Sequence, residues 1–312
     1  MAKPFLKWAG GKRQLLGDLF SRLPSTFGEN EFRQYVEPFL GGGAVLFEMF
    51  NRRKIDSAVV FDSNIDLVLC YQVVKYHVQE LLGSLEELKT SYHAKKNYEQ
   101  RKDFYWGLRT AFNKNIGQNN TSWSTKKRVL HATRFIVLNK LCFNGLFRVN
   151  RQGEFNVPPS DLTDKAIFSS SNLKDVSDVL QNVTIIHGDY SVAVEHITPN
   201  TFVYFDPPYR PLTKTSFVAY SKSDFTDKEQ GDLADLCLEL GTEVKVMVSN
   251  SNPKSVTPSD DFFDRIYPNT AGFVHHPVLA NRAINSQGSS RTGTGELIIT
   301  NYTVPTQSKL SL

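Results

Sequence analysis

Short apolar and β-branched runs recur along the chain, and each has the length of a buried strand. Two amphipathic stretches predict helices. Residues 12–23 place leucines on one face, and the predicted helix 228–240 opens at Thr226-Asp227-Lys228-Glu229, in which Thr226 and Glu229 have the spacing of a capping box. The predicted strands are residues 34–39, 58–61, 183–187, 201–205, 244–249 and 296–302. Strands separated by helices predict an α/β fold on a mostly parallel, doubly wound sheet.

The strand pattern is interrupted in the middle of the chain. Between Asp62 and Val183 the strand signals fade, and residues 66–140 have the pattern of helices joined by polar loops, including a loop at 113–124. This interruption predicts an inserted, mainly helical domain. The predicted division is a discontinuous sheet domain (1–65 and 167–304), the inserted domain (66–166), a polar return linker (161–178) and a flexible tail (305–312).

Positive charge is concentrated in one segment of the chain. Residues 91–151 contain thirteen Lys or Arg and two acidic residues, a local net charge of +11, whereas the whole chain carries +4. Aromatic residues interleave with these cations, among them Trp106 and Trp123. Cations neutralise phosphates and aromatic rings stack on bases, so the segment predicts nucleic-acid binding. A solvated helical surface is the alternative interpretation.

Composition sets the remaining bounds. The chain has 312 residues, of which 40% are hydrophobic and 22% charged, as expected of a globular protein with one large or two smaller domains. No apolar run approaches the roughly 18 residues that span a membrane, and no signal peptide is predicted. Three cysteines without close spacing, Cys70, Cys142 and Cys237, argue against a disulfide framework or a zinc cluster. We therefore expect a reducing, cytoplasmic location and no metal.

The most informative stretch for chemistry is Asp206-Pro207-Pro208-Tyr209, directly after the predicted strand 201–205. Ligands of open α/β sheets bind at the carboxyl ends of the strands. Two prolines stiffen the turn and remove two N–H donors, so a carboxylate and a carbonyl remain as acceptors beside an aromatic ring. Such a site suits a planar base with an amino group, adenine or cytosine. An ordinary proline-rich turn is the alternative.

Three further turns follow predicted strands. Glycines at 41, 42 and 43 follow the strand 34–39, and Asp62 follows the next strand about 20 residues later, where an acid can bind ribose hydroxyls. The Gly-x-Gly-x-x-Gly spacing of NAD proteins is absent, which favours S-adenosylmethionine as the adenosine-containing cofactor. Asp189 ends another strand and is a candidate for the adenine pocket. Gly10-Gly11-Lys12 near the N-terminus is compatible with anion binding but is not a Walker motif.

Taken in order, these motifs resemble those of the Dam-type (D12 class, alpha group) DNA adenine-N6 methyltransferases. The resemblance covers nearly the whole chain, and six blocks in family order are far more specific than any one of them. The matching blocks are 5–12, 36–43, 62–64, 143–148 with 153–158, 206–209 with 211–213, and 217–220 with Phe225 and Gln230. The resemblance implies a Rossmann-like S-adenosylmethionine-dependent methyltransferase sheet with an inserted, mainly helical DNA-recognition domain.

The resemblance also assigns roles to individual residues. In the inserted domain, Leu146 resembles a leucine that wedges into the DNA stack, and Arg148 resembles an arginine that reads a guanine. The implied cofactor contacts are Trp8, Lys12, Glu37, Phe39, Gly41, Gly43, Asp62, Asp189 and Asp206. The implied catalytic residues are Asp206, Pro207, Pro208 and Tyr209. The DNA-binding candidates are Asn144, Leu146, Arg148, Asn150, Asn156 and Arg128.

The resemblance implies a specific reaction, methyl transfer from S-adenosylmethionine to N6 of a flipped adenine in double-stranded DNA, leaving S-adenosylhomocysteine. GATC is the expected recognition sequence, although residues 159–162 replace a basic stretch of the family by Pro-Ser-Asp-Leu. We expect a bacterial or phage monomer, with a cognate restriction endonuclease as a candidate partner. Cytosine-N4 methylation, RNA methylation and non-catalytic DNA binding remain alternatives.

Overall fold

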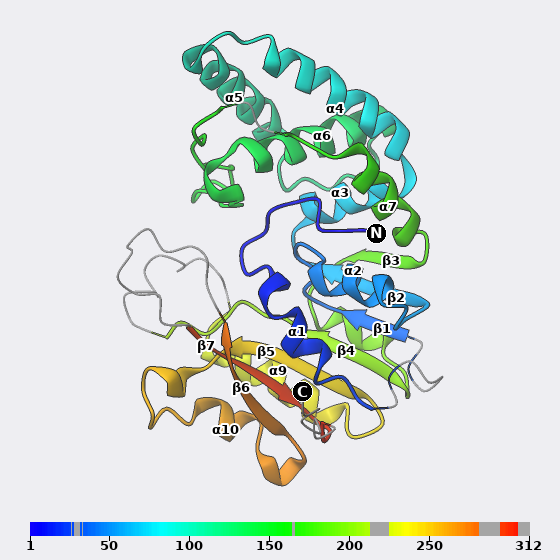
Figure 1. Ribbon diagram of the computed structural model, residues 1–312, viewed down its shortest axis with the longest axis vertical. Coiled ribbons are helices and arrows are strands. Elements are labelled where there is room, and N and C mark those ends of the chain that lie inside the picture. The colour runs from blue at the N-terminus through cyan, green and yellow to red at the C-terminus, as the bar shows by residue number, and fades with distance from the viewer. Residues whose placement is uncertain are drawn as a thin grey trace, which may run out of the picture. The chain divides into compact units, whose positions relative to one another are not determined.

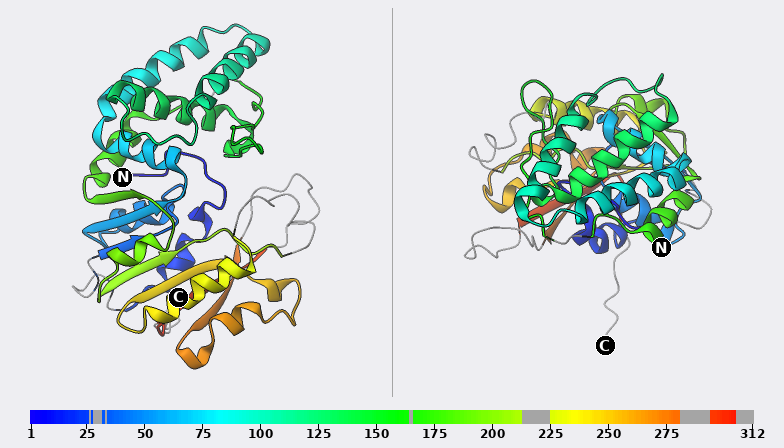
Figure 2. Two further views of the ribbon diagram at one scale, coloured as in Figure 1. Left: turned by 180° about the vertical axis from the view of Figure 1, so that it is seen from behind. Right: turned by 90° about the horizontal axis from the view of Figure 1, so that it is seen from above.

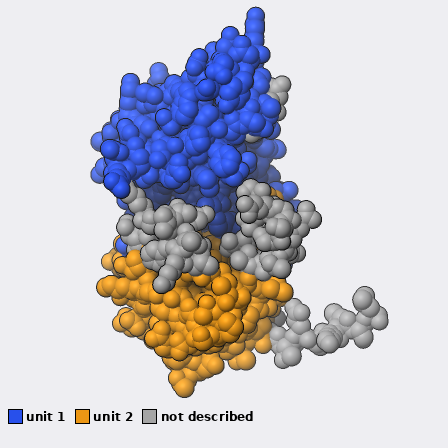
Figure 3. All heavy atoms as spheres, turned by 90° about the vertical axis from the view of Figure 1, so that its left-hand side faces the viewer, with its two compact units in different colours: residues 1–11, 40–52, 60–189 blue, residues 12–39, 53–59, 190–312 orange. Residues whose placement is uncertain are grey.

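The computed structural model describes residues 1–25, 27, 32, 34–163, 166–212, 225–280 and 294–304. The chain divides into two compact units, which Figure 3 draws in different colours. Unit 1 comprises residues 1–11, 40–52 and 60–189, and unit 2 comprises residues 12–39, 53–59 and 190–312. The predicted motif residues 213 and 217–220 and the predicted tail, 305–312, lie outside the described residues.

A seven-stranded sheet runs through the described residues (Figure 1), in the order β3-β2-β1-β4-β5-β7-β6. Neighbouring strands β1, β4 and β5 are parallel, whereas β7 runs antiparallel to both β5 and β6. The α/β prediction is thus confirmed, with a mixed edge. The strands are β1 Gln34–Glu37, β2 Ser57–Asp62, β3 Val183–His187, β4 Thr201–Phe205, β5 Lys245–Ser251, β6 Val274–Ala280 and β7 Thr294–Thr300.

Strand β4 forms the centre of the sheet. All five of its residues are buried, as expected of a strand covered on both faces, and this explains its continuous apolar sequence. Val36 of β1 and Val246 of β5 flank Val203 in register. The strand order reverses between β1 and β4, so the carboxyl end of β4 lies at the position where such sheets bind ligands.

Helices make up most of unit 1. In Figures 1 and 2, α4, α5 and α6 lie side by side, and α6 packs against α3, α4 and α5. Side chains of Asn64, Asn97 and Ser124 cap α3, α5 and α6. The predicted helical content of 66–140 is confirmed, whereas the predicted domain boundaries stay a prediction. The helices are α2 Ala44–Asn51, α3 Ile65–Tyr76, α4 Val78–His93, α5 Tyr98–Asn113, α6 Thr125–Leu141 and α7 Ser170–Leu180.

Helix α7 corrects the prediction that residues 161–178 form a linker. Ser169 caps the helix through the backbone N–H of Asn172, and Leu173, Val176 and Leu180 are buried at helical spacing. Polar residues such as Lys174 and Asp178 lie between them on the exposed side of the helix, so the composition of the segment alone does not reveal its apolar stripe.

Residues 12–23 do not form the single helix that their leucine pattern predicts. A 3₁₀ turn, η1 Lys12–Gln14, is followed by the short helix α1 Leu16–Phe20. The backbone N–H of Leu15 donates to the carbonyl of Lys12 at 2.9 Å, which tightens the chain at this point. The side chain of Lys12 is buried.

The remaining elements belong mainly to unit 2. Helix α9, Asp227–Glu239, begins with the predicted capping box of Thr226 and Glu229. Strand β6 was not predicted, because His275, His276 and Pro277 break its apolar pattern; the proline is tolerated because β6 ends the sheet. The other elements are α10 Phe262–Ile266, η2 Phe143–Gly145 in unit 1, η3 Val192–His196, η4 Pro253–Ser255 and η5 Asn269–Ala271.

Candidate active site

The carboxylate of Asp206 lies directly after β4 and is held by two donors within unit 2. Lys12 Nζ lies 2.7 Å from Asp206 Oδ1, and Ser249 Oγ donates to the same oxygen at 2.8 Å. Burial raises the pKa of Asp206, while the Lys12 ammonium and the Ser249 hydroxyl oppose that shift. The hydroxyl of Tyr204 lies 2.8 Å from Ser249 Oγ and completes the chain of contacts. The carboxylate is therefore oriented and paired with a buried cation.

Two contacts fix the side chain of Tyr209, one to its hydroxyl and one to the face of its ring. Its hydroxyl donates to Glu296 Oε2 at 3.0 Å, and Lys12 Nζ lies 4.4 Å from the ring centroid. Burial, together with the negative charges of Asp206 and Glu296, raises the pKa of Tyr209 well above its usual value. The phenol is thus neutral over the physiological range, and its ring presents a fixed aromatic surface.

The turn itself is braced by α9 and β5. Gln230 Nε2 donates to the carbonyl of Pro208 at 2.9 Å, and Asn250 Nδ2 donates to Gln230 Oε1 at 3.1 Å. Asn250 Oδ1 in turn accepts from the backbone N–H of Arg210 at 3.0 Å. Pro207 is buried within this arrangement. The four residues 206–209 are therefore held from both sides by hydrogen bonds.

Arg210 extends this brace beyond the tetrapeptide. Its Nε lies 2.8 Å from Asp227 Oδ1, and its Nη1 lies 2.8 Å from Asp260 Oδ2. The guanidinium also lies over the ring of Phe262, 4.3 Å from its centroid. Hydrogen bonding to Asp227 is the main cause that raises the pKa of Arg210. Arg210 thus joins the turn to the start of α9 and to the segment before α10.

Unit 2 also contains Glu37 and Phe39, two of the predicted cofactor residues. Glu37 is buried, and the hydroxyl of Tyr35 donates to its Oε2 at 2.8 Å. Phe39 is half-buried and contacts the rings of Tyr190 and Phe225, with centroids 5.8 and 5.7 Å away. The rings of Tyr190 and Phe225 also contact each other, at 5.9 Å. Such a cluster of three rings suits packing against a planar ligand.

In unit 1, Asp62 holds the glycine turn that follows β1. Asp62 Oδ2 accepts from the backbone N–H of Gly41 at 2.9 Å, and Oδ1 accepts from that of Asn64 at 2.9 Å. Burial raises the pKa of Asp62, and these two N–H donors oppose the shift. A carboxylate offers about four acceptor positions, so two remain for other donors such as a ribose diol.

Two more predicted residues, Trp8 and Asp189, are distant from Asp62 in the sequence but lie near its turn in space. The side chain of Trp8 packs on the glycine turn so closely that a Cβ on Gly41 would lie 2.9 Å from Trp8 Cδ1. Asp189 is exposed, and its neighbour Gly188 donates from its backbone N–H to the carbonyl of Asp62 at 3.2 Å. The structure therefore brings Trp8, Gly41, Asp62 and Asp189 into one neighbourhood.

Gly43, also predicted, lies at the start of α2. Its φ is +68°, and a Cβ would lie 2.8 Å from the hydroxyl of Tyr71. The Tyr71 hydroxyl donates to the carbonyl of Gly41 at 3.1 Å, so the turn is fixed from the α3 side as well. The glycine at 43 is needed for close packing of this loop.

The predicted DNA-contacting residues lie on a hairpin-like loop after α6. The backbone N–H of Asn156 donates to the carbonyl of Arg148 at 3.0 Å, and Arg148 Nε donates to Asn156 Oδ1 at 2.8 Å. Asn144 is exposed with φ 54°, and Leu146 is half-buried. Asn150 Oδ1 accepts from two backbone N–H groups of the turn at the tip, those of Gln152 and Glu154. The loop thus presents the exposed guanidinium of Arg148.

Arg128 lies apart from this loop, in the first turn of α6, whereas the loop follows the last turn. Its guanidinium donates to the carbonyl and Oδ1 of Asn120 and, at 2.8 Å, to Gln72 Oε1. Burial lowers the pKa of Arg128. These bonds connect α6, the 114–124 loop and α3, and a contact from Arg128 to DNA stays a prediction.

A family model described as D12 class N6 adenine-specific DNA methyltransferase matches residues 8–284. This chain belongs to that family. The D12-class methyltransferase is 44% identical over 303 residues to the type II methyltransferase M.MjaIII of Methanocaldococcus jannaschii, with 96% of this chain and 99% of the relative covered. It is 33% identical over 304 residues to M1.LlaDCHI of Lactococcus lactis subsp. cremoris (96% and 95% covered). It is 31% identical over 298 residues to the DNA adenine methylase of Escherichia coli K12 (95% and 94% covered).

Membership confirms the family resemblance and the methyltransferase fold. The chain is an adenine-specific DNA methyltransferase by family, and a methyltransferase of this kind requires a methyl donor. Among the described residues, no cluster of three or more His, Cys, Asp or Glu is arranged to hold a metal ion. Over the same part of the chain, no helix combines the length and apolar character that crossing a membrane requires.

Several side chains at the site of this D12-class enzyme escaped the sequence analysis. Ser249 and Glu296 contact Asp206 and Tyr209 from β5 and β7, and an acid within the apolar strand β7 was the available signal for Glu296. Phe143, which begins the matched block 143–148 but was given no role, is 52% exposed beside Asn144.

Proposed function

We propose that this D12-class enzyme transfers a methyl group from S-adenosylmethionine to N6 of an adenine flipped out of double-stranded DNA. The observation that carries the proposal is the Asp206 carboxylate at the end of the central strand, oriented by Lys12 and Ser249 in a chain that belongs to an adenine-N6 family. The activity is that of a site-specific, adenine-specific DNA methyltransferase.

The residues of the tetrapeptide act on the amine of the target base. The lone pair of that amine is conjugated with the ring, so the nitrogen is a poor nucleophile. Asp206 and the carbonyl of Pro207 accept the two amine hydrogens and direct the lone pair out of conjugation. Asp206 also stabilises the positive charge that develops on the nitrogen, and Tyr209 stacks on the flipped base.

The chain's own residues supply the cofactor contacts. S-adenosylmethionine, when bound, supplies a methyl group activated by a sulfonium. Asp62 retains acceptor capacity for the ribose hydroxyls, and the glycine turn that it holds allows a ligand close to the backbone. The remaining contacts are assigned to Trp8, Lys12, Glu37, Phe39, Gly41, Gly43, Asp189 and Asp206. Positioning of amine and methyl donor by these groups supplies the proximity contribution to the rate.

We assign recognition of the DNA sequence to the loop after α6. Leu146 enters the base stack, and the exposed Arg148 reads a guanine through two hydrogen bonds. Asn144, Asn150 and Asn156 support these contacts, and the +11 segment of residues 91–151, Arg128 included, attracts the phosphates. We infer GATC as the recognition sequence.

The cellular setting follows from the substrate and the relatives. The compared relatives come from prokaryotes, in which DNA lies in the cytoplasm, so we infer a cytoplasmic enzyme. Two of those relatives are named type II methyltransferases. A restriction endonuclease acting on the same site is the proposed partner, and the enzyme is proposed to act as a monomer.

The testing experiment uses plasmid DNA without adenine methylation. The full chain is incubated with this DNA and S-adenosylmethionine, and the modified bases are read by single-molecule sequencing. N6-methyladenine confined to one short sequence is expected. Methylation at another sequence would correct GATC alone, whereas N4-methylcytosine or unmodified DNA would refute the proposed reaction.

A further inference from the structure

One buried amide holds two segments of unit 1 that lie far apart in the sequence. Asn139, in the last turn of α6, is 4% exposed. Its Oδ1 accepts from the backbone N–H of Lys7 at 2.8 Å, and its Nδ2 donates to the carbonyl of Lys7 at 2.8 Å. The same Nδ2 donates to the carbonyl of Gly145 at 3.0 Å. The N-terminal segment and the loop after α6 are thus fixed by one side chain.

The two segments also touch each other directly. A Cβ on Gly145, whose φ is +65°, would lie 2.3 Å from the Cβ of Lys7. Trp8 stacks on Phe147, with centroids 5.7 Å apart and planes at 22°. Phe135 of α6 contacts both rings, at 6.3 and 5.5 Å. The approach of Lys7 therefore requires glycine at 145. The aromatic contacts restrict movement of the N-terminal segment along the loop.

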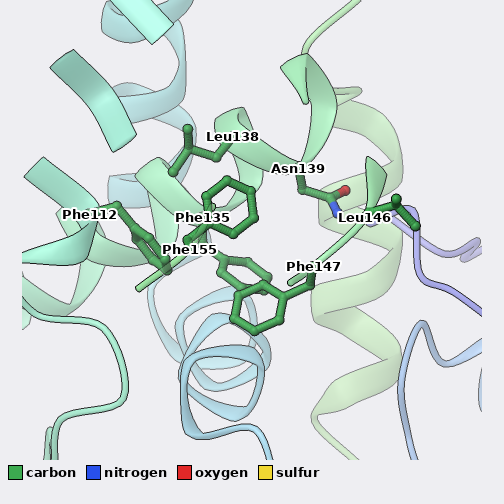
Figure 4. Close-up of a pocket in the computed structure, with 7 residues that line it drawn as sticks. All are labelled: Phe112, Phe135, Leu138, Asn139, Leu146, Phe147 and Phe155. Carbon is green, nitrogen blue, oxygen red and sulfur yellow. The ribbon is translucent and has the colours of Figure 1, made fainter. Parts of the chain in front are cut away.

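Figure 4 shows the space beneath this contact. The side chains of Asn139, Leu146 and Phe147 lie around a small cavity, together with Phe112, Phe135, Leu138 and Phe155. The lining is apolar except for Asn139, so loss of its amide would leave the carbonyls of Lys7 and Gly145 without that donor beside an apolar surface.

Trp8 also contacts the glycine turn. A Cβ on Gly41 would lie 2.9 Å from Trp8 Cδ1, and one on Gly42 would lie 3.2 Å from Trp8 Cβ. Asp62 holds the backbone N–H of Gly41. One indole ring therefore contacts both the turn assigned to the cofactor and the loop assigned to DNA.

We propose that Asn139 is a positioning residue that fixes the segment of Lys7 and Trp8 against the loop 143–148, so that cofactor binding at the glycine turn and DNA binding at the loop strengthen each other. The proposal rests on the proposed function, which assigns the two ligands. Because Trp8 packs on both the glycine turn and Phe147, a ligand that favours one position of the turn also favours the matching position of the loop, and DNA then binds a loop that already has that position. By linkage, DNA binding strengthens cofactor binding by the same factor.

The test measures that factor directly. Equilibrium affinity of the full chain for a fluorescent duplex carrying the sequence found by plasmid sequencing is determined with and without saturating S-adenosylhomocysteine. The wild-type affinity is expected to rise at least about fivefold with S-adenosylhomocysteine, the lower end of common coupling factors. In Asn139→Leu, which removes all three hydrogen bonds at similar volume, the ratio is expected to fall to about one.

Asn113→Leu is the matched control. Asn113 is also a helix-borne amide that bonds to the backbone of the loop, but to its other arm: Oδ1 accepts from the N–H of Phe155 at 3.0 Å, and Nδ2 donates to its carbonyl at 3.1 Å. This substitution is expected to weaken DNA binding equally with and without S-adenosylhomocysteine. The wild-type ratio should therefore persist in the control.

The outcomes separate the two proposals. A wild-type protein that methylates DNA but shows a ratio of about one overturns the coupling and leaves the proposed function intact. A wild-type ratio retained in Asn139→Leu overturns the role of Asn139. Should Asn139→Leu lose its cooperative thermal transition, Phe147→Leu replaces it, because this variant removes the stack on Trp8 and keeps an apolar side chain. An unchanged ratio in Phe147→Leu overturns the proposed contact between the segment of Lys7 and Trp8 and the loop as the route of the coupling. Wild-type protein without methylation activity refutes the proposed function itself.

Discussion

Replacement of Lys12 by methionine tests the electrostatics around the tetrapeptide. Lys12 is 7% exposed, and its ammonium lies 2.7 Å from an Asp206 side chain that is 18% exposed. Methionine preserves most of the volume of the lysine stem and removes the charge. The variant leaves a buried carboxylate with Ser249 Oγ at 2.8 Å but without its cation.

The expected loss of stability in Lys12→Met follows from the burial of the Lys12–Asp206 ion pair. Removing one partner of a buried ion pair destabilises a protein by about 3–5 kcal/mol, and we expect about 3 kcal/mol at slightly alkaline pH because Asp206 keeps some exposure and the Ser249 bond. The packing difference alone is expected to cost about 1 kcal/mol, as for other swaps that nearly conserve volume. Charge therefore accounts for most of the effect.

The pH dependence distinguishes charge from packing. Burial already raises the pKa of Asp206 in the folded protein, and loss of Lys12 raises it further. A carboxyl group with a raised folded pKa contributes stability that is fully present below its unfolded pKa and is lost as pH rises through the folded pKa. The loss is larger in the variant, so its destabilisation relative to wild type should be greatest at about pH 8 and shrink toward about pH 5. Urea unfolding at several pH values measures this difference.

Two further variants serve as controls. The double variant Lys12→Met/Asp206→Asn has no buried charge at this position and should regain most of the lost stability at about pH 8. Lys75→Met removes a lysine whose Nζ donates to the carbonyl of Val183 at 2.8 Å, so its destabilisation should not vary with the ionisation of a carboxylate. A penalty for Lys12→Met that is the same at every pH would refute the electrostatic reasoning.

Three further changes address separate parts of the molecule. Asp206→Asn, which can still accept hydrogen bonds, should abolish methylation while binding of S-adenosylhomocysteine persists; near-normal turnover would contradict the assigned role. Arg148→Ala should cost about 1–3 kcal/mol of discrimination at one base pair, measured by competition between duplexes, and an unchanged profile would remove Arg148 from base reading. Asn64→Ala removes the acceptor of the N–H groups of Asp66 and Leu67 and should lower the free energy of unfolding by about 0.5–2 kcal/mol; an unchanged urea midpoint would contradict this capping role.

Local patterns account for the elements that could be predicted. The run of apolar and aromatic residues that follows Thr201 in β4 predicts a strand covered on both faces, and Thr226 with Glu229 predicts the start of α9, because each signal lies within a few consecutive residues. The sequence analysis missed β6 and α7 for the opposite reason. Pro277 is tolerated in β6 because this strand ends the sheet, and the charged residues of α7 lie on the more exposed side of that helix.

The sequence predicts the site only in part, because several of its contacts join segments that lie far apart in the chain. The acid of Asp206 and the glycine turn follow strands, so topology rules place them at strand ends. Ser249, Glu296 and Asn139 act through partners that are 43, 87 and 132 residues away in the chain. Nothing in their own sequence neighbourhood specifies these partners, because the pairing is set by sheet register and helix packing.

Lys12 shows how a residue-by-residue resemblance and a structure add to each other. The resemblance assigns Lys12 to the cofactor, whereas the structure places its ammonium on Asp206 and over the ring of Tyr209. Without the lysine, the buried carboxylate of Asp206 would tend to bind a proton, because burial raises its pKa, and a protonated carboxyl has lost the charge that stabilises a developing cation. The lysine opposes this rise in the pKa and orients the carboxylate before any ligand arrives. Its proximity to Asp206 is therefore a requirement of the proposed chemistry, and loss of turnover in Lys12→Met should be accompanied by a shift of the acidic limb of the rate profile to higher pH.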